Sequence, residues 1–517
     1  MIVSGYWPSQ APYEEIPLPE LARRSAERFG DKAALIGADG TTRTYRDLWS
    51  HARKVARLLQ DHGIEKGDKV GIFSPNHVDY GAVFYGILLA GGTVTTLNPL
   101  YREREIEHQL DDAEAVALFV FSPMAAPVEA ARRNLPRLRH VWPIESLPDL
   151  LGDVSEEYRP VEINAREDIA VLPYSSGTTG LPKGVMLTHH NITANVKQGL
   201  ATEQLTSDSV GLCVLPFFHI YGMTVLLSTG LALGITGVVM MRFDVEQMLE
   251  LVGKYGMTNL YLAPPAILAM ANVPNPSRFD TSSLRLVQSG AAALPPEVGE
   301  RVKSIYNCLV LQGYGLTETS PSTNTNPLDR IKPESCGVPL ADTFEKIVSL
   351  DTGKELPAGE VGEVAVQGPQ VMKGYWKRPE ETSECLSEDG WLLTGDIGRL
   401  DEDGYLYIVD RKKEMIKYKG YQVAPAELEA VLHEHPAVLD AAVIPKPHLE
   451  GGEIPKALVV LREGFEASPE ELMAFVAEKV APYKKIREVE YVSEVPKSAA
   501  GKILRRDLIE RERAKKG

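Results

Sequence analysis

The chain has 517 residues, of which 44% are hydrophobic and 24% charged, and these ordinary values exclude collagen-like, coiled-coil and disordered proteins. Asp and Glu (71) outnumber Lys and Arg (55), which gives a net charge of −16. Because nucleic-acid phosphates are repelled by such a protein, we expect no nucleic-acid partner, although a nucleotide can still bind through backbone N–H groups, a few cations and a metal.

Apolar runs of strand length alternate with helical patterns through most of the chain. Continuous Val, Ile and Leu runs separated by helices predict mainly parallel sheets that are covered on both faces. The fold class is therefore α/β, with a large N-terminal domain of mainly parallel sheets flanked by helices. The predicted strands lie at 69–74, 115–121, 169–175, 211–216, 259–264, 284–290 and 308–315, and the clearest helices lie at 79–92 and 244–256.

Residues 209–241 contain no Asp, Glu, Lys or Arg, and this stretch is long enough to cross a bilayer. Pro216 and His219 interrupt its first half and Gly222, Gly230, Gly234 and Gly237 the rest, and its flanks lack the clustered Lys and Arg of a membrane anchor. We therefore predict a strand (209–216), an apolar helix (223–234) and a second strand (236–241) rather than a membrane span.

From about Phe344 the pattern changes to shorter β segments with Asp/Gly turns, which predicts a small β part. A compact tail follows the basic residues 411–413. Its helix at 424–435 has Pro425 near the start, and strands at 440–445 and 456–461 and a helix at 468–480 follow. We expect two domains, 1–412 and 413–517, the second a small α+β unit.

Four cysteines occur in the chain, with no CxxC and no metal-ligand spacing. So few thiols indicate a reduced compartment without a disulfide framework. The N-terminal residues show no basic segment followed by an apolar run, so we expect a cytoplasmic protein. The cysteines are Cys213, Cys308, Cys336 and Cys385.

The segment from Tyr174 to Gly184, YSSGTTGLPKG, directly follows a predicted strand. Its glycines allow close approach of the backbone, its hydroxyls can donate to phosphate oxygens, and Lys183 adds positive charge. It is not a Walker A loop, because Pro182 and Gly184 replace the glycine and the Ser/Thr that such a loop needs. Composition alone favours a flexible surface loop over a phosphate-binding one.

A second motif, QGYGLTE, spans 312–318. Glu318 stands where a dinucleotide fingerprint needs its third glycine, so Rossmann-type binding is disfavoured. Instead, Tyr314 offers an aromatic face for a base, Thr317 offers a hydroxyl for a phosphate, and Glu318 offers a hard oxygen for Mg²⁺. An ordinary strand-to-helix turn is the alternative.

Two weaker motifs follow. Asp396 comes directly after a tight turn (TGD), and such a carboxylate can accept both hydroxyls of a ribose. The segment 497–506, KSAAGKILRR, contains Lys502 between glycine and apolar residues, although single charges in it would fit a solvated basic tail.

In this order and spacing, YSSGTTGLPKGV, GYGLTE, TGD, DRKKEMIKYKG and PKSAAGK resemble the adenylate-forming enzymes, which include acyl-CoA synthetases, 4-coumarate–CoA ligases, beetle luciferases and peptide-synthetase adenylation domains. The resemblance covers nearly the whole chain and is greatest to bacterial fatty-acid–CoA ligases. It implies ATP, Mg²⁺ and coenzyme A as cofactors, ATP and acid binding by domain 1–412, and a mobile C-terminal domain that hinges at Lys413.

The resemblance also implies a role for each site residue. Ser175, Ser176, Gly177, Thr178, Thr179, Gly180 and Lys183 bind the triphosphate. Gly290, Ala291, Ala292, Gly313, Tyr314 and Gly315 form the adenine site. Thr317 contacts phosphate, Glu318 is the metal ligand, Asp396 and Arg411 hold the ribose, and Lys502 is the adenylation lysine. Lys417, Lys419, Gly420 and Gln422 belong to the face that works in the thiol-transfer step.

The implied reaction fits these residue types. A carboxylate attacks the α-phosphate of ATP, so two anions must meet, and a metal ion with a lysine offsets their repulsion. Pyrophosphate leaves, a thiol then attacks the acyl carbon, and AMP is released. No protein nucleophile is needed, and no GxSxG motif occurs.

The acid is expected to lack an amino group. The segment 217–222, FFHIYG, lies in the uncharged stretch, where an ammonium would be buried without a partner. His219 either shapes the carboxylate end of the pocket or is a core histidine. Candidate lining residues are Met223, Tyr261, Ala263, Gly290, Ala291, Gly315, Pro321 and Val338.

We therefore expect an ATP-dependent acid–CoA ligase, with a fatty acid favoured and an aryl acid second. A luciferase-like oxidoreductase, a membrane-bound transporter-like protein and a non-catalytic nucleotide-binding module are the alternatives. Partners are small molecules (the acid, ATP and CoA), and the protein is expected to be a monomer or homodimer.

Overall fold

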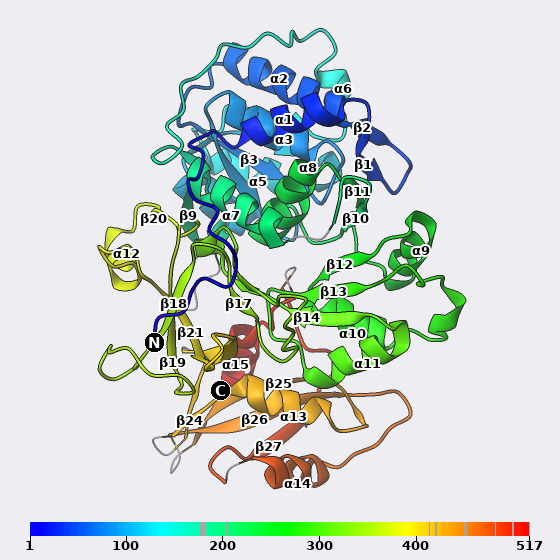
Figure 1. Cartoon of the computed structure of the whole chain (residues 1–517), viewed down its shortest axis with the longest axis vertical. Coiled ribbons are helices and arrows are strands. Elements are labelled where there is room, and N and C mark those ends of the chain that lie inside the picture. Colours follow the sequence, from blue (N-terminus) through cyan, green and yellow to red (C-terminus); the bar gives the residue numbers. More distant parts are fainter. Residues whose placement is uncertain are drawn as a thin grey trace.

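The computed structural model describes residues 1–175, 182–202, 205–412, 414–418, 421–448, 452–480, 482–498 and 501–515. Layered sheets and helices of the N-terminal part fill the upper two thirds of Figure 1, and a smaller β-rich domain lies below them. The α/β fold class expected from the sequence is confirmed. Of the predicted site residues, 176–180, Lys419 and Gly420 lie outside the described ranges, as does the predicted hinge Lys413.

The largest sheet forms where the sequence has continuous apolar runs. Its central strands are parallel and almost completely buried, as expected for strands with helices on both faces. The strand that carries Lys183 runs antiparallel to its neighbours, so the predicted parallel order ends there. The order is β20 (Gly374–Tyr375), β9 (Lys183–Thr188), β7 (Ile169–Val171), β4 (Thr93–Leu97), β3 (Lys69–Phe73), β5 (Ala115–Val120) and β6 (His140–Pro143), with β8 (Tyr174–Ser175) paired to β9.

Helices of different character cover this sheet. Helix α2 (Tyr45–Asp61) starts at a capping box in which the Thr44 and Asp47 side chains each accept from the other's backbone N–H. Helix α3 (Tyr80–Leu89) is apolar all round and every residue in it is buried. The other helices of this region are α1 (Pro19–Phe29), α4 (Glu103–Asp112), α5 (Ala125–Ala131), α6 (Leu147–Leu150) and α7 (His189–Thr202).

The uncharged stretch forms two strands and a helix inside the fold, as predicted. The helix differs in one respect, because its first part, η3 (Tyr221–Thr229), is a π-helix that continues into α8 (Gly230–Leu233). Across the described ranges, no helix combines the length and apolar character that a membrane span requires. The strands β10 (Val210–Cys213) and β11 (Thr236–Val239) join β1 (Ala33–Gly37) and β2 (Thr42–Thr44) in one sheet.

A three-stranded parallel sheet follows, with its own apolar core. Asp244 caps α9 (Val245–Tyr255) by accepting from the Gln247 N–H, and Gly256 ends that helix in the left-handed conformation. The strands are β12 (Asn259–Leu262), β13 (Leu286–Ser289) and β14 (Leu309–Gln312), and the other helices are α10 (Pro264–Ala271) and α11 (Pro296–Tyr306).

The predicted small β part is an antiparallel sheet. Its last two strands contain a bulge, because Ile397 pairs with Asp410 whereas Gly398 pairs with Ile408, which leaves Val409 as an extra residue. The strands are β18 (Phe344–Val348), β19 (Gly362–Gln367), β21 (Leu392–Leu400) and β22 (Leu406–Arg411). A separate small sheet consists of β15 (Tyr314–Gly315), β16 (Ser322–Thr325) and β17 (Val338–Pro339). Helix α12 (Pro379–Cys385) lies near β20.

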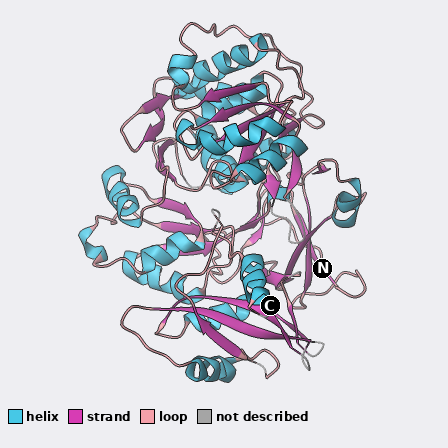
Figure 2. Ribbon diagram, turned by 180° about the vertical axis from the view of Figure 1, so that it is seen from behind, coloured by secondary structure: helices cyan, strands magenta, loops and turns pink. Residues whose placement is uncertain are grey.

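The C-terminal domain has a five-stranded sheet with helices packed on an apolar core. Figure 2, seen from behind, shows this domain below the larger part of the chain, with the C-terminal helix near their junction. Its elements are β23 (Ile416–Tyr418), β24 (Tyr421–Val423), α13 (Pro425–His433), β25 (Val438–His448), β26 (Gly452–Leu461), α14 (Pro469–Lys479), β27 (Glu488–Tyr491) and α15 (Arg505–Ala514). All four cysteines of the chain are described and are free thiols.

Candidate active site

A cleft of about 1860 Å³ lies between the C-terminal domain and the rest of the chain. The ends of β14 and β15, the hairpin β21–β22 and the start of α10 border it from the N-terminal side. The segment around Lys502 borders it from the C-terminal domain. Motifs that are far apart in the sequence therefore meet in one cavity.

Tyr314, Asp396 and Arg411 form a connected group in this cleft. The Tyr314 hydroxyl donates to Asp396 Oδ2 at 2.6 Å, and Arg411 Nε lies 3.3 Å from Asp396 Oδ1. Asp396 and Arg411 face each other as a register pair of β21 and β22. Burial raises the pKa of Asp396, and the Arg411 guanidinium opposes that rise. The sequence motifs GYG, TGD and DR thus contribute to one polar cluster.

Glu318 lies at the centre of a second group. Its Oε1 accepts from the Ser175 hydroxyl at 3.2 Å and from the Tyr375 hydroxyl at 2.9 Å. Among the described residues, no group of three or more His, Cys, Asp or Glu side chains could hold a metal ion by itself. One carboxylate beside two hydroxyls is a hard-oxygen donor set, and it fits Mg²⁺ that takes further ligands from phosphate oxygens.

Lys183 lies beside the Glu318 group. Its Nζ is 5.2 Å from the centre of the Tyr375 ring and 3.7 Å from Glu381 Oε1. The register pair of Ser175 and Lys183 joins the two ends of the glycine-rich motif. Thr317 borders the same cleft. A cation, hydroxyls and a carboxylate therefore surround the place where the sequence predicts a triphosphate.

Lys502 points into the cleft from the C-terminal domain. Burial and the charge of Arg411 lower its pKa to about 8, whereas Asp396 and Glu318 act in the opposite direction. The preceding Gly501 packs closely on α10, since a Cβ at this position would lie 2.7 Å from Pro265 Cδ. Only a residue without a side chain allows this approach.

His219 lies in the same cleft, near Lys502. Its Nδ1 accepts from the backbone N–H of Tyr221 at 3.2 Å. Burial and the nearby charge of Lys502 lower the pKa of His219 to about 3. The imidazole is therefore neutral at physiological pH.

Small residues keep the backbone of the predicted adenine and acyl region close to its neighbours. A Cβ at Gly315 would lie 2.3 Å from the Pro321 carbonyl oxygen, and one at Gly290 would lie 2.7 Å from Tyr221 Cε1. Ala291 has a positive φ of 74°, which is uncommon for a residue with a side chain. Ala291, Ala292, Gly313 and Gly315 line the cleft, whereas Met223 and Val338 are buried in the protein interior.

Of the predicted thiol-transfer residues, Lys417 is the one whose side chain the structure describes, and it does not line the cleft. Lys417 is exposed on β23, and its backbone N–H donates to Glu453 Oε2 at 2.8 Å. For Gln422 the structure gives the backbone pairing within β24 and β23. The role of these residues stays a prediction.

Tyr375 was not predicted from the sequence, although it donates to Glu318. It belongs to β20, which reaches the site only because it pairs with β9, nearly 200 residues earlier in the chain. The dipeptide Gly374–Tyr375 has no distinguishing sequence signal of its own. Long-range strand pairing therefore completes the site.

Comparison with known proteins shows the family to which the chain belongs. Residues 22–376 match the family described as "AMP-binding enzyme", and residues 427–502 match "AMP-binding enzyme C-terminal domain". The chain is similar to 4-coumarate–CoA ligase 1 of Petroselinum crispum, with 40% identity over 96% of this chain and 94% of the relative. It is also similar to a long-chain-fatty-acid–CoA ligase of Bacillus subtilis (strain 168), with 38% identity over 98% and 97%.

Among solved structures, an anthranilate CoA ligase, AuaEII, in complex with anthranoyl-AMP superimposes with a TM-score of 0.90. Its sequence is 29% identical, and the match covers 97% of each chain. The likeness therefore extends over both the large N-terminal part and the C-terminal domain.

Proposed function

We propose a substrate class for this chain, which belongs to the AMP-binding enzyme family and is an AMP-forming acid–CoA ligase. The acid is an apolar carboxylic acid without an amino group, and a fatty acid is the first candidate. The observation that supports this most is the uncharged wall beside His219. Phe218, Ile220 and the alanines 291–293 line the cleft there. A substrate ammonium would find no carboxylate on this wall and would face Lys502, which makes amino acids unfavourable substrates.

We propose the following places for the nucleotide. The ring of Tyr314 and the turn at Ala291–Ala292 hold adenine, and Asp396 with Arg411 holds the ribose. The segment 175–183 and Thr317 hold the phosphates. Glu318 would hold Mg²⁺, which offsets phosphate charge when bound.

Lys502 then has a direct task in the first step. A carboxylate oxygen of the acid attacks the α-phosphorus, and the bond to the leaving pyrophosphate breaks. Negative charge gathers on the phosphoryl oxygens, and the Lys502 ammonium stabilises that charge from the C-terminal side of the cleft. His219, which is neutral, can lie next to the acid carboxylate without adding charge.

The second step needs different residues of the C-terminal domain to face the cleft. In it the thiol of coenzyme A attacks the acyl carbon, and AMP leaves with the electron pair of the broken C–O bond. We propose that the domain of residues 413–517 rotates at Lys413 after adenylation. Lys502 then leaves the cleft, and the face with Lys417, Lys419, Gly420 and Gln422 approaches it.

An aryl acid is the second candidate, and one contact favours it. The Tyr221 ring lies against Gly290, where a Cβ would be 2.7 Å from its Cε1, and the next residue, Ala291, lines the cleft, so an aromatic ring lies next to the proposed acid site. The relative that is 40% identical to this chain is named as a 4-coumarate–CoA ligase, an enzyme of an aryl acid.

A panel of acids tests the proposal. Pyrophosphate release is measured with ATP and Mg²⁺ for fatty acids of increasing chain length, hydroxycinnamic acids and amino acids, with and without CoA. Mass spectrometry identifies the thioester, and the Lys502→Ala variant is the control for contaminating ligases. The highest kcat/KM for a fatty acid supports the first candidate, a preference for hydroxycinnamates supports the second, and a preference for amino acids contradicts both.

A further inference from the structure

Helix α10 contacts the C-terminal domain at both of its ends. At its start, Pro265 lies against Gly501, the residue next to Lys502. Just after its end, the Asn272 Oδ1 accepts from Arg462 Nη1 at 2.6 Å. Eight residues of helix span about 12 Å, so two contacts at that separation fix the orientation of one domain against the other better than one contact can.

The Arg462–Asn272 hydrogen bond joins two well-fixed backbone positions. Asn272 also donates through Nδ2 to the Leu268 carbonyl at 2.7 Å, which orients its amide. Arg462 directly follows β26, and its backbone N–H donates to the Ala437 carbonyl at 2.9 Å. Because both partners are held by their own domains, the bond can form only when the domains have this relative position.

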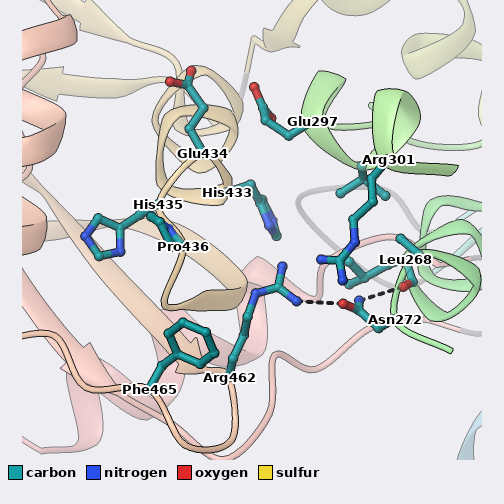
Figure 3. A pocket seen from close by; sticks show the side chains of 12 residues that line it. Leu268, Asn272, Glu297, Arg301, His433, Glu434, His435, Pro436, Arg462 and Phe465 are labelled. Atoms are coloured by element: carbon teal, nitrogen blue, oxygen red, sulfur yellow. Dashed lines mark hydrogen bonds between the residues drawn. The ribbon is translucent and has the colours of Figure 1, made fainter. Parts of the chain in front are cut away.

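The bond borders a separate cavity of about 400 Å³ between α10, α11 and the C-terminal domain. Figure 3 shows Arg301 of α11 and Arg462 with their guanidinium groups turned toward one another. Burial and the charge of Arg301 lower the pKa of Arg462. The attraction between Arg462 and Asn272 is therefore opposed by the repulsion between the guanidinium groups of Arg462 and Arg301, which border the same cavity.

We propose that Arg462 and Asn272 form a latch that holds the conformer in which Lys502 reaches the cleft, and that Arg301 weakens this latch. The proposal rests on the domain rotation described under the proposed function. It makes Arg462 and Asn272 positioning residues for the adenylation step, because neither touches the reacting groups. A contact that has to break in every turnover needs to be weak, and the opposing charge of Arg301 supplies that weakness.

The latch predicts opposite effects for neighbouring residues. Arg462→Gln and Asn272→Ala each remove the charge-assisted bond and should lower the single-turnover rate of pyrophosphate release about tenfold, with little change in the KM for ATP. Thioester formation from a synthetic acyl-adenylate and CoA should stay at the wild-type rate or rise. Arg301→Gln removes the repulsion, so the latch should open more slowly. Adenylation should then be unchanged, and thioester formation should be slower by a few-fold.

Hydrogen exchange supplies a readout that needs no acid substrate. Peptides covering 260–275 should exchange faster in Arg462→Gln and Asn272→Ala than in wild type, and more slowly in Arg301→Gln. Arg462→Lys keeps a donor and should recover part of both the exchange protection and the adenylation rate. Failure of the acid panel would leave this exchange result untouched, so the two proposals can be judged separately.

Two results would overturn the latch. One is a similar fall of both half-reactions in Arg462→Gln and Asn272→Ala with unchanged exchange at 260–275. The other is an effect of Arg301→Gln in the same direction as that of Arg462→Gln, because a merely structural interface would be damaged by either change.

Discussion

The Tyr314 hydroxyl donates a 2.6 Å hydrogen bond to Asp396, so the residue proposed to stack on adenine also fixes the carboxylate proposed to hold the ribose. Hydrogen bonds to charged groups are stronger than neutral ones, and this one lies next to the Arg411 guanidinium. The adenine and the ribose of one nucleotide would thus be held by a single hydrogen-bonded unit.

Tyr314→Phe keeps the aromatic ring and removes this bond. We expect the KM for ATP to rise about tenfold, since a hydrogen bond to a charged group contributes about 1.5 to 3 kcal/mol. The measurement is the ATP dependence of pyrophosphate release. Tyr6→Phe is the matched control, because Tyr6 donates to Asp329 outside the cleft. An unchanged KM would remove the hydroxyl from nucleotide binding.

Lys502→Ala should nearly abolish acyl-adenylate formation and spare the thiol step. The reason is that the ammonium enters the cleft from the C-terminal domain, close to Asp396 and Glu318, where phosphoryl charge would develop. Thioester formation from a synthetic acyl-adenylate measures the second step alone. Lys515→Ala, which alters a surface ion pair of the same domain, is the control. Equal loss of both half-reactions in a folded variant would show that the assignment is wrong.

The pKa of Lys502, lowered to about 8, predicts a pH dependence of adenylation. The ammonium is positive below this value and neutral above it, so the adenylation rate should fall as the pH rises through about 8. Single-turnover pyrophosphate release between pH 6 and 10 measures this limb. Lys502→Arg keeps its charge over that range, so any residual activity should lack the decline. A wild-type rate that stays level to pH 10 contradicts the role of the charge.

Glu318→Gln should raise the Mg²⁺ concentration needed for half-maximal pyrophosphate release. The amide can still accept from Ser175 and Tyr375, but it lacks the charge that attracts a hard cation. Titration of Mg²⁺ at saturating ATP measures the effect, and thermal unfolding without Mg²⁺ checks the fold. Glu381→Gln, which changes a carboxylate beside Lys183 instead, is the matched control. The same Mg²⁺ dependence in Glu318→Gln and wild type would exclude this carboxylate from the metal site.

Glu345→Gln should stabilise the protein at neutral and alkaline pH. Glu345 is fully buried, its Oε2 accepts from Asn324 Nδ2, its Oε1 has no hydrogen-bond partner among the described residues, and burial raises its pKa to about 8. A carboxyl whose pKa is raised on folding stabilises the fold fully below the unfolded value, and that stability is lost as the pH rises through about 8. The wild-type Tm should therefore fall between pH 5 and 8.5 by more than that of Glu345→Gln. Parallel Tm curves for the two proteins would contradict the prediction.

Much of the site could be read from the sequence because its motifs are local. Tyr314 and Glu318 lie in one heptapeptide that ends the predicted strand and continues beyond β14, whereas Asp396, expected after a tight turn, lies within β21. The roles expected for all three came from the family resemblance. The α/β class could be predicted for the same reason. The spacing of apolar residues that identifies a strand or a helix depends only on residues close together in the sequence.

The remaining features depend on contacts between distant segments. Tyr375 reaches Glu318 only through pairing of β20 with β9, and Arg462 reaches Asn272 only through the position of one domain against another. The π-helical form of Tyr221–Thr229 has no signature in its apolar composition. Close approach of Gly222 to the Pro216 carbonyl, where a Cβ would lie 2.2 Å from the oxygen, is likewise a property of the folded chain.

The bulge in β22 decides the sign of the charge next to Asp396. With regular pairing from Gly398 and Ile408 onward, Asp410 would stand opposite Asp396, and two carboxylates would face each other. The extra residue Val409 advances the strand by one position and presents Arg411 instead. A ladder that paired Val409 with Ile397 would therefore exchange an attraction for a repulsion without altering a single polar side chain, so the bulge is as strict a requirement as the identity of Arg411.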